Sequence, residues 1–266
     1  MNLKKYGEYT IDSKELKKGL ELIPLYIPCI IVGGVAVQLY CKEDKLKRPT
    51  NDIDFLPEYL GFIGKNTLSD VGEKFQSESK KMNYYIEHSK NRGGYEIKMF
   101  NGEYAPLFFH LSTFSENYWE KHFNEKKREI EHANIISDKK YTVKVHNLED
   151  LVVNKTKRLN YMDNQGLLNE SESKKLSDIR SGQIESAYFE FDPEQKLDEF
   201  VNLRRDNLNE CGEPESQGKE YWTSLNNVKI LKDFYDLGLI GMMVVNGQEK
   251  FDIKYFLDSI KLLPSL

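Results

Sequence analysis

The chain has 266 residues, of which 39% are hydrophobic and 30% charged, and its formal net charge is −5 at neutral pH. These values are typical of a globular protein with one large domain or two small ones, and they exclude a surface that is basic throughout. No apolar run approaches the length of a membrane span, and no apolar stretch follows the first charged residues as in a signal peptide. Three cysteines without metal-ligand spacing indicate reduced thiols, so we expect a cytoplasmic protein that does not enter a membrane.

The predicted elements form a mixed part and then a helical part. In the mixed part, apolar spacing and turn signals predict a helix at 11–23 that Pro24 stops, and further helices at 35–40, 66–82 and 116–129. They predict strands at 30–32, 52–55, 83–88, 95–100 and 107–114, and a hairpin at 133–145. From Leu148 onward we predict a helix and then a polar loop at 162–173. A helix restarts at Ser173, and three more helices follow at 194–208, 218–238 and 252–263. This order predicts an α/β domain with a mixed β-sheet at residues 1–147, followed by a helical domain at 148–266.

The stretch from residue 30 to residue 55 carries the strongest chemical signal. An apolar run breaks at Gly33-Gly34 and continues as a helix, and glycine there lets an anion approach the N–H groups of the first helical turn. About twenty residues later, Asp52-Ile-Asp54-Phe alternates as a strand does, which places both aspartates on one face. Two carboxylates so close repel each other, and a divalent cation such as Mg²⁺ would neutralise them. Alone, the two aspartates would be a solvated strand face, but the preceding glycine turn favours a phosphate and metal site.

This arrangement resembles the nucleotidyltransferase superfamily that includes DNA polymerase beta and the aminoglycoside nucleotidyltransferases. The signature of that superfamily is a Gly-Gly or Gly-Ser turn that opens a helix, followed by an Asp-x-Asp strand. Val32-Gly-Gly-Val-Ala36 and Arg48-Pro-Thr-Asn-Asp-Ile-Asp-Phe55 look most like the AbiEii-type branch, which comprises toxins of bacterial toxin–antitoxin and phage-abortive systems. Two later segments, 148–158 and 174–179, resemble a second motif of that branch. The resemblance extends over residues 25–185.

The resemblance implies a nucleotidyltransferase fold followed by a C-terminal helical bundle, with the active site in the cleft between the two domains. Asp52 and Asp54 would be catalytic and would hold Mg²⁺ or Mn²⁺, and an NTP would be the donor substrate. The implied nucleotide-binding residues come from the glycine turn, the approach to the aspartate strand and the second motif: Gly33, Gly34, Arg48, Thr50, Lys155, Arg158 and Asp178. Arg48 and Thr50 would bind phosphate or support the aspartates. Asp178 would orient Lys155 or contact the base or the acceptor.

The chain departs from the family pattern at the third carboxylate. The family places an Asp or Glu on a later strand between apolar residues, and here that context, Leu107-Phe-Phe-His-Leu111, holds His110. A neutral imidazole can bind a metal, but it prefers softer ions than Mg²⁺. His110 is therefore a candidate catalytic residue, and Glu96 on the preceding strand is a candidate substitute for the third carboxylate. The alternative is a strand histidine without a catalytic role.

We therefore expect a metal-dependent nucleotidyltransferase of the AbiEii-like toxin type. It would transfer a nucleoside monophosphate from an NTP to an RNA such as tRNA, to a protein or to a small molecule, and an antitoxin would be its partner. Two alternatives stay open. One is a binding protein that keeps the fold but has lost catalysis through His110. The other is an antibiotic-modifying nucleotidyltransferase, which shares the first motif but is less like the segment from Lys155 to Asp178.

Overall fold

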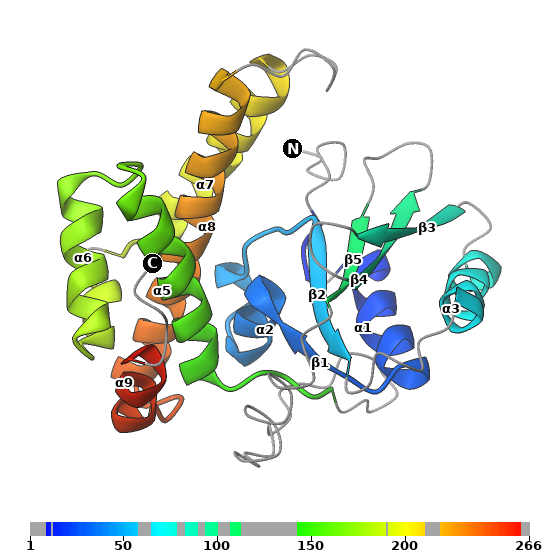
Figure 1. Cartoon of the computed structure of the whole chain (residues 1–266), viewed down its shortest axis with the longest axis horizontal. Helices are drawn as coiled ribbons and strands as arrows, with labels where there is room; N and C mark the ends of the chain where they lie inside the picture. The colour runs from blue at the N-terminus through cyan, green and yellow to red at the C-terminus, as the bar shows by residue number, and fades with distance from the viewer. Residues whose placement is uncertain are drawn as a thin grey trace. The chain divides into compact units, whose positions relative to one another are not determined.

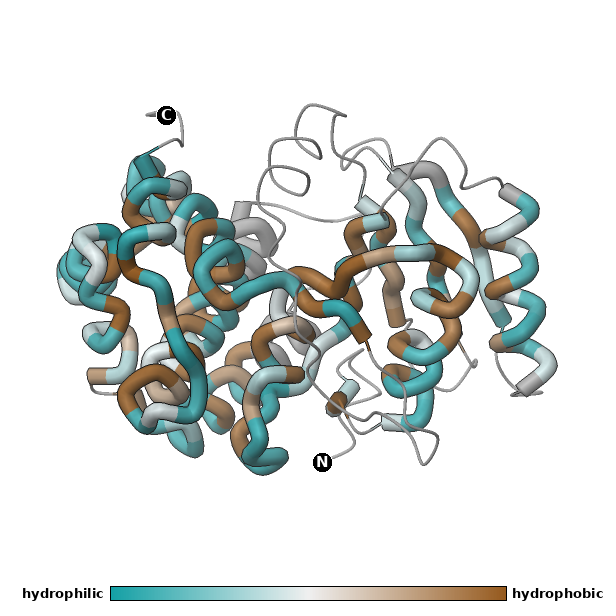
Figure 2. The backbone as a smooth tube through the Cα atoms, turned by 90° about the horizontal axis from the view of Figure 1, so that it is seen from below, coloured by the Kyte–Doolittle hydropathy of each residue, from teal (hydrophilic) through white to brown (hydrophobic). Residues whose placement is uncertain are grey.

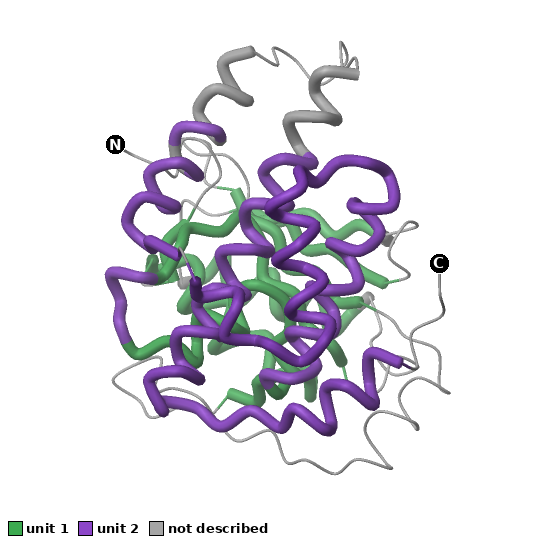
Figure 3. The backbone as a smooth tube through the Cα atoms, turned by 90° about the vertical axis from the view of Figure 1, so that its left-hand side faces the viewer, with its two compact units in different colours: residues 1–42, 47–147 green, residues 43–46, 148–266 purple. Residues whose placement is uncertain are grey.

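The computed structural model describes residues 9–11, 13–57, 65–78, 83–89, 94–100, 107–112, 143–189, 191–210 and 219–261. The predicted helix at 116–129 lies outside these residues, and so does the predicted hairpin at 133–145 except for its last three residues. The chain divides into two compact units, residues 1–42 with 47–147 and residues 43–46 with 148–266 (Figure 3). An α/β region with a five-stranded sheet is followed by a helical region, which confirms the predicted fold class at this level.

The first unit contains a mixed sheet and three helices among its described residues (Figure 1). Its elements are α1 (Lys14–Tyr26), β1 (Cys29–Val32), α2 (Gly33–Tyr40), β2 (Asp52–Pro57), α3 (Lys65–Glu78), β3 (Asn83–Ser89), β4 (Gly94–Phe100) and β5 (Leu107–Ser112). The strand order is β1-β2-β5-β4-β3. Strands β2 and β5 run parallel, and the other neighbouring pairs run antiparallel. The predicted mixed sheet is therefore confirmed.

One face of this sheet carries the core of the first unit. Its fully buried side chains include Ile53, Phe55, Ile97, Met99, Phe109 and Leu111. Helix α1 packs so closely on β5 that a Cβ atom at Gly19 would lie 2.1 Å from the Phe109 ring. The ring of Phe75 from α3 lies on the same face, with its centroid 5.3 Å from that of Phe109. Because side chains alternate along a strand, the residues between these core positions point to the opposite face.

Helix α1 does not end where the sequence predicted. Ser13 caps its start by accepting a hydrogen bond from the Leu16 N–H at 3.4 Å, and the helix then continues through Pro24 to Tyr26. Just beyond it, the Ile27 N–H donates to the Ile23 carbonyl at 2.8 Å. A proline in the last turn removes its own N–H donor but leaves the following residues able to bond. The prediction that Pro24 stops the helix was therefore wrong.

The second unit is helical in its described residues. Its elements are the 3₁₀ turn η2 (Asp44–Leu46), α5 (Leu148–Asn164), α6 (Glu170–Arg180), the 3₁₀ turn η4 (Ile184–Ala187), α7 (Pro193–Glu210), α8 (Lys219–Val245) and α9 (Ile253–Lys261). Hydrophilic and hydrophobic residues alternate along the helices as teal and brown bands in Figure 2. Helix α6 starts at Glu170, before the predicted Ser173, because Asn169 and Glu172 form a capping box. None of the described helices combines the length and the apolar composition that crossing a membrane requires.

Candidate metal centre

Asp52 and Asp54 lie on the face of β2 that points away from the core. Ile53 and Phe55 are fully buried on the other face, whereas the side chains of Asp52 and Asp54 are 31% and 28% exposed. The two-residue period of the strand fixes this division. The core therefore anchors the backbone of β2, while both carboxylates stay accessible to a small ion.

The carboxylate of Asp54 lies against the start of α2. Val32, the last residue of β1, pairs with Asp54 across the sheet, and the next residue, Gly33, has φ of +75°. A Cβ atom at Gly33 would lie 2.5 Å from Asp54 Oδ2, so any larger residue would displace the carboxylate or the turn. Val32 provides no side-chain hydrogen bond at the N-cap of α2. Val32 therefore does not cap the N–H groups of the first turn. An anion site at a helix start requires N–H groups that no side chain caps.

Thr50 supports Asp52 from the residues before the strand. Its side chain is buried, and Oγ1 donates a hydrogen bond to Asp52 Oδ1 at 3.0 Å. Its backbone exchanges two hydrogen bonds with Tyr9, at 2.7 and 2.9 Å. Arg48 is also buried and donates from Nη1 to the Pro49 carbonyl at 3.2 Å. Of the two roles considered for Thr50, support of an aspartate matches this geometry.

His110 approaches the aspartates from β5, whose parallel register places it opposite Asp54. Its Nδ1 atom lies 3.1 Å from Asp54 Oδ1 and 3.8 Å from Asp52 Oδ2. One possible ligand atom from each of the three residues lies within 4.8 Å of the others. The three side chains could therefore hold a single metal ion together.

Glu96 contacts the other ring nitrogen of His110. The antiparallel register of β4 and β5 pairs these residues, and Glu96 Oε2 lies 2.7 Å from His110 Nε2. On the same sheet face, Lys98 Nζ lies 3.4 Å from Glu96 Oε1 and 2.7 Å from Glu87 Oε2. The hydrogen bond between Lys98 and Glu87 raises the pKa of Lys98 and lowers the pKa of Glu87. Glu96 is thus placed to orient the imidazole.

Lys155 and Arg158 lie one turn apart on α5, and both pair with aspartates of α8. Lys155 Nζ lies 2.5 Å from Asp236 Oδ2 and 3.3 Å from Asp233 Oδ1. Arg158 Nε donates to Asp233 Oδ2 at 2.5 Å, and its Nη2 contacts Asp233 Oδ1. Lys155 and both aspartates are buried, whereas the Arg158 side chain is 53% exposed. The hydrogen bonds of the Lys155 ammonium group therefore go to α8, and Asp178 of α6 is not among its partners.

Sequence reasoning missed Asp233 and Asp236. Both are fully buried, three residues apart, in a stretch of α8 that is otherwise mostly apolar. Buried carboxylates need charged or hydrogen-bonding partners. Two aspartates at this spacing in an apolar helix were therefore a readable signal that α8 pairs with basic residues elsewhere in the chain.

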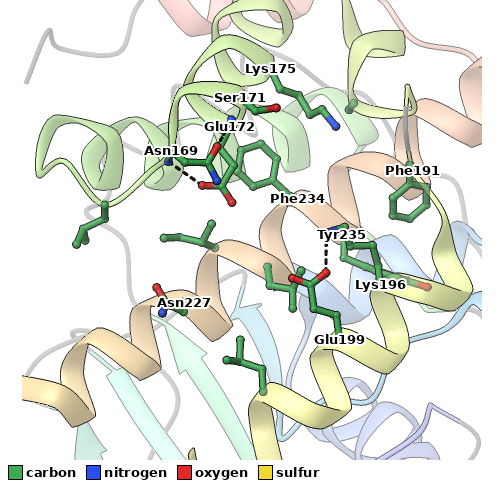
Figure 4. A pocket seen from close by; sticks show the side chains of 15 residues that line it. Asn169, Ser171, Glu172, Lys175, Phe191, Lys196, Glu199, Asn227, Phe234 and Tyr235 are labelled. Atoms are coloured by element: carbon green, nitrogen blue, oxygen red, sulfur yellow. Dashed lines mark hydrogen bonds and ion pairs between the residues drawn. The ribbon is translucent and has the colours of Figure 1, made fainter.

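The second unit also contains a cavity of about 530 Å³ between α6, α7 and α8 (Figure 4). Its wall is partly aromatic, with Phe191, Phe234 and Tyr235, and partly charged. The two lysines in the wall have partners: Lys175 Nζ donates to the Phe189 carbonyl at 3.1 Å, and Lys196 Nζ pairs with Glu199 at 2.7 Å. None of the site residues predicted from the sequence lines this cavity.

Comparisons with protein-family models, with curated proteins and with solved structures found no match to this chain. The function of the site must therefore be inferred from its own residues. Two carboxylates, an imidazole and a glycine turn lie together in the first unit, and the carboxylates and the imidazole form a possible metal-binding group.

Proposed function

We propose that this chain is a metal-dependent nucleotidyltransferase of the AbiEii-like toxin type, which transfers a nucleoside monophosphate from an NTP to an acceptor. One observation carries this proposal above all others. Asp52, Asp54 and His110 lie together next to Gly33, at the point where α2 begins. The glycine turn and the two aspartates, which form the first motif of the sequence resemblance, are therefore close together in space, as a shared catalytic role requires.

The side chains suit a bound divalent cation, which the sequence resemblance implies to be Mg²⁺ or Mn²⁺. A cation would offset the repulsion between Asp52 and Asp54, and both carboxylates are exposed enough to receive it. The hydrogen bond from Thr50 Oγ1 fixes one oxygen of Asp52. When bound, such an ion supplies charge stabilisation for the attacking and leaving oxygens of a phosphoryl group.

In the proposed reaction, a hydroxyl oxygen of the acceptor bonds to the α-phosphorus of the NTP. The bond from that phosphorus to the bridging oxygen breaks, pyrophosphate leaves with the electron pair, and the hydroxyl proton passes to solvent. N–H groups in the first turn of α2 would donate to the pyrophosphate oxygens, because Gly33 and Gly34 leave room for them. Arg48, Lys155, Arg158 and Asp178 are proposed nucleotide contacts by resemblance, and Arg158 is sufficiently exposed for an anion to reach it.

The test is label transfer from each of four α-labelled NTPs to total RNA, to protein or to an aminoglycoside, with Mg²⁺ or Mn²⁺. The double variant Asp52→Asn with Asp54→Asn should reduce transfer to background while keeping the fold, because it removes the charges that hold the cation. Asp70→Asn, the same chemical change at an exposed position of α3, is the matched control. Undiminished transfer by the double variant would place the reaction elsewhere. Growth arrest on expression, its absence for the double variant and its relief by an antitoxin from a neighbouring small gene would support the toxin assignment.

A second function is favoured by the carboxylates on both sides of His110. A protonated imidazole that donates to Asp54 at 3.1 Å and to Glu96 at 2.7 Å would itself offset part of the negative charge of the cluster. The chain would then be a binding protein that has kept the fold and lost catalysis. Nucleotide binding that needs no divalent cation, without transfer to any acceptor, is the result that this reading predicts.

A further inference from the structure

The imidazole of His110 is held at both of its nitrogens. The residue is 6% exposed, so its ring is fixed by its surroundings. Nδ1 faces the aspartates of β2, at 3.1 Å from Asp54 and 3.8 Å from Asp52. Nε2 lies 2.7 Å from Glu96 of β4. The strand registers that pair Asp54 with His110, and His110 with Glu96, produce this row across the sheet.

A carboxylate on the far nitrogen is the usual support of a metal-binding histidine. It accepts the N–H of one ring nitrogen, fixes the tautomer, and leaves the lone pair of the other nitrogen for the metal. With the proton on Nε2, bonded to Glu96, the lone pair of Nδ1 points to the space that Asp52 and Asp54 share. Glu96 is itself held by Lys98 at 3.4 Å.

The nitrogen ligand changes which ion suits the site. Mg²⁺ is a hard cation that prefers oxygen ligands and loses its water reluctantly. Imidazole nitrogen favours first-row transition metals, whose affinities for a given nitrogen and oxygen site rise from Mn²⁺ to Cu²⁺ and are lower again for Zn²⁺. Two carboxylates and one imidazole therefore form a set that discriminates against Mg²⁺.

We propose that His110 is a nitrogen ligand that makes this centre select a divalent transition metal over Mg²⁺, and that Glu96 is the positioning residue that directs Nδ1 to the ion. This assignment rests on the metal site of the proposed function. It does not need nucleotidyl transfer to occur.

The test measures metal binding by the full chain without nucleotide. Mn²⁺ and Mg²⁺ affinities are determined by calorimetry, and pulsed EPR of bound Mn²⁺ reports whether a nitrogen is coordinated. The unmodified chain should bind Mn²⁺ more tightly than Mg²⁺ and show ¹⁴N coupling from one imidazole. His110→Asp should remove the ¹⁴N coupling and lower the ratio of Mn²⁺ to Mg²⁺ affinity by about tenfold or more, because a hard oxygen replaces the nitrogen.

Glu96→Gln tests the positioning role with the His110 ligand still present. Loss of an outer carboxylate typically weakens metal affinity by about 10–100-fold, so Mn²⁺ binding should fall in this range while ¹⁴N coupling persists. Glu87→Gln is the matched control, because Glu87 shares the sheet face and the Lys98 partner. Its Mn²⁺ affinity should stay near that of the parent. An equal fall in both variants would assign the effect to Lys98 and would overturn the positioning role.

Several outcomes would overturn the nitrogen ligand. These are equal affinities for Mn²⁺ and Mg²⁺, bound Mn²⁺ without ¹⁴N coupling in the unmodified chain, or no metal binding at all. The EPR measurement needs no variant, so it decides the question even if His110→Asp fails to fold. Mg²⁺-dependent transfer without ¹⁴N coupling would keep the proposed function and overturn this assignment. Selective binding of Mn²⁺ with nitrogen coordination, but without transfer to any acceptor, would keep this assignment and overturn the proposed function.

Discussion

Gly33 is required both by the backbone and by the carboxylate beside it. Its φ of +75° lies in a region that L-residues with side chains rarely adopt, and its missing Cβ leaves room for Asp54 Oδ2. We expect Gly33→Ala to destabilise the fold by about 1–3 kcal/mol and to weaken metal binding, because the carboxylate must move. Urea unfolding and metal titration by calorimetry measure the two effects separately.

Gly166→Ala is the control for Gly33→Ala. Gly166 has φ of +67°, and a Cβ atom there would meet nothing within 4 Å. The control should therefore show comparable backbone strain and unchanged metal affinity. If both variants bind metal like the parent, displacement of the Asp54 carboxylate does not affect the ion, and Asp54 is not a metal ligand.

At the scale of elements, the sequence was sufficient for β2 and insufficient for the pairing of β4 with β5. The alternation of Asp52, Ile53, Asp54 and Phe55 is local information, so it predicted both the strand and which face carries the carboxylates. The place of Glu96 at the far nitrogen of His110 depends on how β4 pairs with β5. A shift of one residue would turn Glu96 to the core face. From the sequence alone, Glu96 was therefore only a candidate for the third carboxylate, and its contact with the imidazole of His110 was not predicted.

The basic residues of α5 show the same limit. Lys155 and Arg158 matched a motif that implies nucleotide binding, and that role stays a prediction. Their partners in α8 lie 75 to 81 residues later in the chain, so local patterns did not reveal them. The buried ion pairs give Lys155 a structural role whether or not it also contacts a nucleotide. A loss of activity in a Lys155 variant therefore needs a parallel measurement of folding.

We expect Asp236→Asn to lower the free energy of unfolding by about 3–5 kcal/mol, because it leaves the buried Lys155 ammonium group short of a counter-charge. Lys155→Met combined with Asp236→Leu removes both charges, and should recover much of this loss. Urea denaturation followed by circular dichroism gives the values. Glu199→Gln, in the exposed pair with Lys196, should cost less than about 1 kcal/mol. An equally small effect of Asp236→Asn would mean that water compensates Lys155 and that α5 and α8 do not depend on the pair.

At the scale of the whole chain, the candidate metal ligands and the buried ion pairs belong to different units. Asp52, Asp54, His110 and Glu96 lie in the first unit, on three strands of one sheet. Residues 43–46 interrupt that unit in sequence and belong to the second. There, the Tyr235 hydroxyl donates to the Leu46 carbonyl at 2.7 Å. A bound metal should therefore stabilise the sheet of the first unit and need not stabilise the helices of the second unit.

Hydrogen exchange with and without Mn²⁺ tests this separation. A ligand at 100 times its dissociation constant stabilises the form that binds it by about 2.7 kcal/mol, which slows exchange through metal-releasing openings about a hundredfold. We expect this slowing for amides of β2, β4 and β5 and little change for α5 and α8. Equal slowing in both units would mean that they open as one cooperative body. Slowing in α5 and α8 alone would place the bound ion at the buried aspartates of α8, because only a metal held there would protect those helices and leave the sheet unaffected.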